Sequence, residues 1–76
     1  MSREPKSLQD QMTLDAAKKG YGRKKIENLN DPKYKGMDKM ELVGKSKHTN
    51  RNSTVHYVRD PLTGELHDFK FTNHFY

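Results

Sequence analysis

Apolar and polar residues alternate along the second half of the chain in the manner of β-strands. The clearest run is Ser53–Arg59, which is rich in β-branched and aromatic residues. Asp60–Gly64 follows with strong turn chemistry, and Glu65–Thr72 returns as the partner strand. Met37–Lys47 precedes them as a further strand. The pattern predicts a three-stranded antiparallel meander, or a four-stranded one if Asn73–Tyr76 adds an edge.

Alternation also predicts which side chains share a face of the sheet. In the last strand, His67, Phe69 and Phe71 share the face that we expect to be buried, and the opposite face carries Leu66, Asp68 and Lys70. The face of the middle strand that joins them depends on the hairpin register, because a slip of one residue reverses it. Gly44 interrupts the first strand and indicates a bulge.

The first half of the chain reads as a leader, a helix and a loop. Residues 1–6 form a loose leader, and residues 7–20 form a helix that runs from about Leu8 to Lys19. Ser7 and Asp10 have the spacing of a capping box, and Gly20 suits the position after the last turn. The apolar stripe expected to cover the sheet consists of Leu8, Met12 and Ala16. Residues 21–36 form a long basic loop.

The composition of the chain limits its fold class and the kinds of partner that it can bind. The 76 residues allow one domain, 1–76, of the α+β class, and 30% of them are hydrophobic. Lysine and arginine outnumber aspartate and glutamate by 15 to 10, so the net charge is +5. Such a charge attracts polyanions, among which RNA is the leading candidate. The chain has no cysteine and no apolar run of membrane-spanning length.

One group of side chains has the chemistry for RNA cleavage without a metal or other cofactor. That reaction needs a base, an acid and cations that stabilise the phosphorane. Histidine suits the first two roles, and arginine or lysine the third. The candidate catalytic residues are His56, Arg59, Lys70 and His67. Ideal alternation places His56 and Arg59 on opposite faces of their strand, so Arg59 would have to reach around from the strand end.

Other residues of the chain are candidates for binding RNA. Lysine and arginine neutralise phosphates, and a tyrosine can stack on a base. The candidates are Tyr21, Arg23, Lys24, Lys25, Lys45 and Lys47. The alternative is a solvated basic loop. A metal site is a further alternative, although the spacing of its candidate ligands fits no known motif; these are His48, His56, Asp60, His67, Asp68 and His74.

Three stretches carry a family resemblance: Asp31–Met37, Val55–Gly64 and Asp68–Phe71. Together they resemble C-terminal toxin domains of bacterial polymorphic toxins, of the Rhs-repeat and contact-dependent inhibition type, over roughly Leu14–His74. The resemblance implies a secreted effector that acts in the cytoplasm of a target cell. It also implies a cognate acidic immunity protein as partner, and a helix-plus-sheet fold in the general style of barnase.

These observations together predict a cytotoxic, metal-independent endoribonuclease that cleaves tRNA or rRNA. Two alternatives remain open. A non-catalytic nucleic-acid-binding module would bind RNA in a salt-sensitive way without breaking it down. A protein-interaction domain would instead pair an exposed hairpin edge with a strand of its partner.

Overall fold

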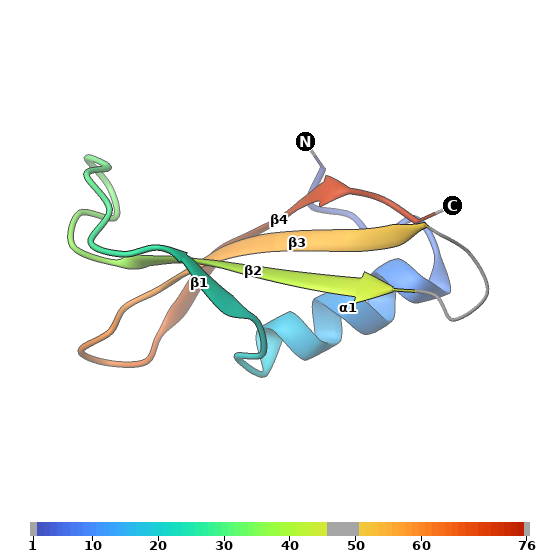
Figure 1. Cartoon of the computed structure of the whole chain (residues 1–76), viewed down its shortest axis with the longest axis horizontal. Coiled ribbons are helices and arrows are strands. Elements are labelled where there is room, and N and C mark those ends of the chain that lie inside the picture. The colour runs from blue at the N-terminus through green and yellow to red at the C-terminus, as the bar shows by residue number, and fades with distance from the viewer. Residues whose placement is uncertain (1, 46–50, 76) are drawn as a thin grey trace.

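The computed structural model describes residues 2–45 and 51–75, which form one helix packed on a four-stranded sheet (Figure 1). The elements in chain order are α1 (Leu8–Lys18), β1 (Arg23–Ile26), β2 (Asp38–Lys45), β3 (Asn52–Arg59) and β4 (Leu66–Asn73). All neighbouring strands are antiparallel, in the order β1-β2-β3-β4. The α+β class and the antiparallel meander are therefore confirmed.

The fourth strand comes from a segment that the sequence predicts to be loop. β1 lies within residues 21–36 and pairs with β2 through Arg23 opposite Glu41 and Lys24 opposite Met40. All four residues of β1 are exposed. The segment shows no alternation because β1 is a short edge strand with no buried face. The prediction of a loop is wrong for these residues, and Lys25 forms a bulge in the strand.

Both ends of α1 are capped at the predicted residues, although the Asp10 carboxylate accepts from the Lys6 N–H and not from the Ser7 N–H of a capping box. The Ser7 side chain accepts a hydrogen bond from the Asp10 backbone N–H. At the other end, the N–H of Gly20 donates to the Ala17 carbonyl and that of Tyr21 to the Ala16 carbonyl, which is the Schellman arrangement. Gly20 has a φ of 92°, a conformation that glycine adopts without a Cβ penalty.

The helix face that packs on the sheet differs from the predicted stripe. Leu8 and Met12 are 77% and 58% exposed, and the buried residues of α1 are Asp10, Thr13, Leu14 and Ala17. These four have the i, i+3, i+4, i+7 spacing of one helix face. Two of them are polar, so hydrophobicity alone points to the wrong side of the helix.

Gly44 marks a close approach of helix and strand instead of a bulge. The β2–β3 register is continuous through Gly44, which lies opposite Ser53. A Cβ at Gly44 would lie within van der Waals overlap of the Thr13 side chain, 2.1 Å from its Oγ1. The missing side chain therefore lets α1 lie directly on β2.

The turn Asp60–Gly64 is confirmed, but the strand after it contains an irregularity. Asp60 Oδ1 accepts hydrogen bonds from the backbone N–H groups of Leu62 and Thr63, and Gly64 has a φ of 80°. Asp68 then has a φ of 60° at a bulge in β4. The bulge reverses the alternation, so His67 lies opposite Val58 and not on the Phe71 face. The predicted sharing of one face by His67 and Phe71 is wrong for this reason.

Both termini are tied to the body of the domain. Ser2 bridges to Phe71 of β4, whose N–H donates to the Ser2 carbonyl at 2.7 Å, so residues 2 and 3 do not form a loose leader. The buried Asp10 carboxylate accepts hydrogen bonds from both ends of the chain and from β3. The donors are the Lys6 N–H, the Ser53 hydroxyl, the His74 ring Nδ1 and the Phe75 N–H.

The hydrophobic core lies between α1 and one face of the sheet. Its buried members are Leu14, Ala17, Met40, Val55, Tyr57 and Phe71. Phe69 stacks on Tyr57 with ring centroids 5.1 Å apart, and the Tyr57 hydroxyl donates to the Tyr21 carbonyl. The Phe69/Phe71 face is thus the helix-covered one, as predicted. The opposite face, which we call the open face, is not covered by any helix of the described residues (Figure 1).

Candidate functional site

A row of charged residues crosses the open face of the sheet. The register places Glu41 of β2 opposite His56 of β3, and His56 opposite Lys70 of β4. Alternation places Lys39, two residues before Glu41, on the same face. Three adjacent strands therefore bring one carboxylate, one imidazole and two ammonium groups together.

The centre of the row is a buried pair of Glu41 and His56. The distance from His56 Nε2 to Glu41 Oε2 is 2.9 Å, and both residues are 8% exposed. Two cations of β1 approach the same carboxylate. Arg23 donates to Oε1 from its Nε at 3.2 Å and from a terminal nitrogen at 2.8 Å, and Lys25 donates to Oε2 at 3.2 Å.

These contacts fix the charge of Glu41. The hydrogen bonds from Arg23, and next the one with His56, lower the pKa of Glu41 to about 2 against the opposing effect of burial. The carboxylate is therefore ionised at neutral pH and accepts a hydrogen bond from the Nε2–H of His56. In the neutral imidazole this arrangement leaves Nδ1 as a lone-pair acceptor, the state that a general base requires.

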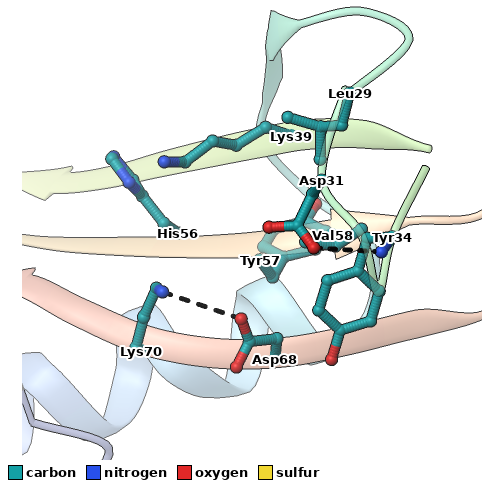
Figure 2. A pocket seen from close by; sticks show the side chains of 9 residues that line it. All are labelled: Leu29, Asp31, Tyr34, Lys39, His56, Tyr57, Val58, Asp68 and Lys70. Atoms are coloured by element: carbon teal, nitrogen blue, oxygen red, sulfur yellow. Dashed lines mark hydrogen bonds and ion pairs between the residues drawn. The ribbon is translucent and has the colours of Figure 1, made fainter. Parts of the chain in front are cut away.

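A pocket of about 90 Å³ lies on the open face beside His56 (Figure 2). Strands β2, β3 and β4 form its floor, and the segment between β1 and β2 forms its rim through Leu29, Asp31 and Tyr34. Lys39, His56 and Lys70 lie at one end of the pocket, on the left in Figure 2, and Asp31 and Tyr34 lie at the other end.

The two lysines of the pocket differ in their partners. Lys70 lies 3.6 Å from Asp68 Oδ2, and Arg3 holds the other oxygen of Asp68 at 2.5 Å. The hydrogen bond from Arg3 lowers the pKa of Asp68, against the smaller opposing effect of burial. Lys39 forms no ion pair with any residue of the described ranges, 2–45 and 51–75, and its ammonium group points toward His56. Lys39 therefore provides a positive charge that no carboxylate of these ranges neutralises.

The structure brings together some of the predicted catalytic residues and separates others. His56 and Lys70 both line the pocket. His67 lies at its border and stacks on Tyr34, with ring centroids 5.9 Å apart. Arg59 lies apart from them, because it pairs with Asp38 at 3.4 Å, so the structure does not support grouping it with His56.

The predicted RNA-binding residues also occupy different environments. Arg23 and Lys25 hold Glu41, while Lys24 lies 3.5 Å from Glu27 and 3.6 Å from Asp38. The side chains of Tyr21 and Lys45 are exposed. Lys47 lies outside the described residues, as does His48 of the alternative metal site.

Sequence reasoning missed Glu41, Lys39 and Asp31. A signal for Glu41 exists: it stands between Met40 and Leu42 in a predicted strand, so it must lie on the face opposite to them. Its contact with His56 depends on the register, which the pattern alone does not determine. In the described part of the chain, no three His, Cys, Asp or Glu residues gather to hold a metal ion.

Comparison with known proteins provides no relative. The chain matches no protein-family model, and no curated protein and no solved structure matches it. Among the residues that the structure describes, no helix is both long and apolar enough to cross a membrane. The geometry of the site is therefore the main basis for inferring the function.

Proposed function

We propose that this protein is a ribonuclease that cleaves RNA by transphosphorylation, with His56 as the general base. The observation that carries the proposal is the Glu41–His56 pair at one end of a pocket that also contains Lys39 and Lys70. A carboxylate that holds one imidazole nitrogen leaves the other free to accept a proton.

The reaction assigns a role to each group. His56 takes the proton from a ribose 2′-hydroxyl, and the 2′-oxygen attacks the adjacent phosphorus. Lys39 and Lys70 stabilise the additional negative charge on the non-bridging oxygens. The bond from phosphorus to the 5′-oxygen then breaks, and this oxygen takes a proton from the Lys39 ammonium group. The products are a 2′,3′-cyclic phosphate and a 5′-hydroxyl. Exchange with solvent then removes the added proton from His56 and returns one to Lys39.

Glu41 is a positioning residue in this scheme. Its negative charge favours the imidazolium that forms when His56 accepts a proton, and Arg23 and Lys25 keep the carboxylate in place. All three side chains come from the β1–β2 pair, so β1 matters to the site although none of its residues is buried.

A cleavage assay tests the proposal. The purified protein is incubated with a defined RNA and with the same RNA carrying 2′-deoxyribose at every position, each with and without EDTA. We expect cleavage of the RNA alone, with 2′,3′-cyclic phosphate ends, at a rate that EDTA does not change. Cleavage of the 2′-deoxy strand, or loss of activity in EDTA, would contradict this mechanism. Salt-sensitive binding of intact RNA would favour the non-catalytic alternative.

The biological role implied by the sequence resemblance, an effector toxin neutralised by an acidic immunity protein, is part of the same proposal. Its support is the resemblance together with the net charge of +5. Expression of the chain inside a bacterium tests it: growth arrest with fragmentation of tRNA or rRNA is the expected result. Normal growth with intact RNA at a confirmed expression level would contradict it.

A further inference from the structure

The two ends of the pocket differ in chemistry, as the two ends of a nucleotide do. The His56 end has two lysines and suits a phosphate. The other end, formed by Leu29, Asp31 and Tyr34, combines apolar, aromatic and carboxylate groups (Figure 2). A nucleobase needs such surroundings, because its faces are apolar and its edges carry hydrogen-bonding groups.

Asp31 has one committed oxygen and one that is open to a ligand. Its Oδ1 accepts hydrogen bonds from the backbone N–H groups of Lys33 at 2.8 Å and Tyr34 at 3.2 Å. No donor of the described residues reaches its Oδ2. Figure 2 shows this second oxygen directed away from the Tyr34 N–H. Asp68, the other carboxylate of the pocket, has both oxygens engaged by Arg3 and Lys70.

The segment that carries Asp31 is fixed by its own backbone hydrogen bonds. The Leu29 N–H donates to the Met37 carbonyl, and the Gly36 N–H donates to the Leu29 carbonyl, both at 2.8 Å. Tyr34 is supported from β4 by its stacking on His67. The open oxygen and the aromatic wall are therefore organised before any ligand binds, which reduces the entropy lost on binding.

A lone carboxylate oxygen distinguishes the four bases by their donors. Guanine presents N1–H and N2–H side by side. The amino groups of adenine and cytosine stand next to a ring nitrogen acceptor, and the N3–H of uracil stands between two carbonyl oxygens, which a carboxylate repels. We propose that Asp31 and Tyr34 form a base-binding subsite that prefers guanine on the 5′ side of the cleaved phosphate. This inference rests on the proposed ribonuclease function, which places the phosphate beside His56.

Binding of mononucleotides tests the subsite without requiring catalysis. The probes are guanosine 3′-monophosphate and uridine 3′-monophosphate, titrated into the full chain and followed by NMR chemical shifts. We expect guanosine 3′-monophosphate to bind about tenfold more tightly, as one charged hydrogen bond allows. Asp31→Asn keeps an oxygen for the loop N–H groups and removes the charge, so the preference should fall below about twofold. Asp15→Asn, on the exposed side of α1, is the matched control and should keep it.

The outcomes separate the subsite from the catalytic proposal. Equal binding of the two nucleotides, no binding of either, or a guanine preference that survives Asp31→Asn would overturn the subsite. If RNA is still cleaved in any of these cases, the ribonuclease proposal stands alone. A guanine preference that depends on Asp31 in a protein that cleaves no RNA would support the nucleotide site and overturn the catalysis. Unfolding midpoints of both variants verify that each is folded.

Discussion

The ring Nε2 of His56 lies 2.9 Å from the Oε2 of Glu41, and the two side chains are neighbours across the β2–β3 pair on the open face of the sheet. The two residues are 15 positions apart in the chain. In the proposed mechanism this contact orients the imidazole, because it holds one ring nitrogen and leaves the other available to accept a proton.

We predict that Glu41→Gln lowers kcat and leaves KM nearly unchanged. The amide keeps the shape of the side chain but removes the charge that favours the protonated imidazole. We expect kcat to fall by about 10- to 100-fold, less than the roughly 100- to 10,000-fold contribution of a general base itself, because His56 is still present. Steady-state kinetics on a short RNA measures both constants. A rise in KM with an unchanged kcat would show that Glu41 serves RNA binding instead.

Lys39 and Lys45 provide a matched pair on β2. Both are expected on the open face by alternation, but only Lys39 lines the pocket. We predict that Lys39→Ala lowers kcat/KM by about 100-fold, a magnitude typical of losing one group that stabilises the transition state. Lys45 is a candidate RNA-binding residue by sequence, but the structure leaves it exposed and outside the pocket. Lys45→Ala should therefore change kcat/KM by no more than about threefold, the scale of a weak exposed charge contact. Equal effects of the two substitutions would indicate a diffuse electrostatic contribution and contradict a phosphate site at Lys39.

Acid should destabilise the fold through two carboxyl groups. The pKa of Glu41 falls from 4.5 to about 2, and that of Asp10 from 3.8 to about 2. For Asp10, burial alone would raise the pKa, but hydrogen bonds from the Phe75 N–H, Ser53, His74 and the Lys6 N–H outweigh burial. A carboxyl group with a lowered pKa in the folded state stabilises the fold above its unfolded pKa, and this contribution is lost as the pH falls.

We therefore predict that the free energy of unfolding decreases between about pH 5 and pH 2, with each group contributing on the order of 2–3 kcal/mol. Denaturant unfolding at a series of pH values measures this decrease. The stability difference between the wild type and Glu41→Gln should be largest at pH 7 and should shrink toward pH 2. A difference that does not depend on pH would contradict the assignment for Glu41.

Gly44→Ala should destabilise the fold by about 1–3 kcal/mol, the usual cost of forcing an extra methyl group into a packed contact. The new Cβ would overlap Thr13, so Thr13→Ala combined with Gly44→Ala should cost less than the sum of the two single changes. Chemical denaturation measures all three variants. Val43→Ala, at a 38% exposed position of the same strand, is the control and should change stability by less than about 1 kcal/mol. Additive effects would contradict the close approach.

Structural features that depend on interactions between neighbouring residues are predictable from the sequence. Ser7, Gly20 and Gly64 act through nearby backbone groups, so the capping of α1 and the β3–β4 turn are predictable. The buried face of the helix is not predictable in this way. Asp10 lies on that face because its carboxylate accepts hydrogen bonds from His74 and Phe75, which are 64 and 65 positions away in the chain. The apolar pattern of Leu8, Met12 and Ala16 gives no indication of these distant hydrogen-bond donors.

The candidate site is predictable in its residue types more than in its geometry. His56 and Lys70 stand out because histidine and lysine on adjacent strands have the chemistry for phosphoryl transfer. The partnership with Glu41 requires the register, and the place of His67 requires the bulge at Asp68, a non-glycine residue with positive φ that no local pattern indicates. The chemistry of a cation groups Arg59 with His56, but alternation places the two side chains on opposite faces of β3, and Arg59 pairs with Asp38.

The central claim, that His56 is the base of an RNA-cleaving site, is tested most directly by the cleavage rate of His56→Gln in EDTA. The glutamine amide can still donate a hydrogen bond to Glu41, but it cannot accept a proton at neutral pH. With the fold verified by its unfolding midpoint, we predict a rate at least about 100-fold below that of the wild type. A His56→Gln variant that cleaves RNA as fast as the wild type would contradict the account.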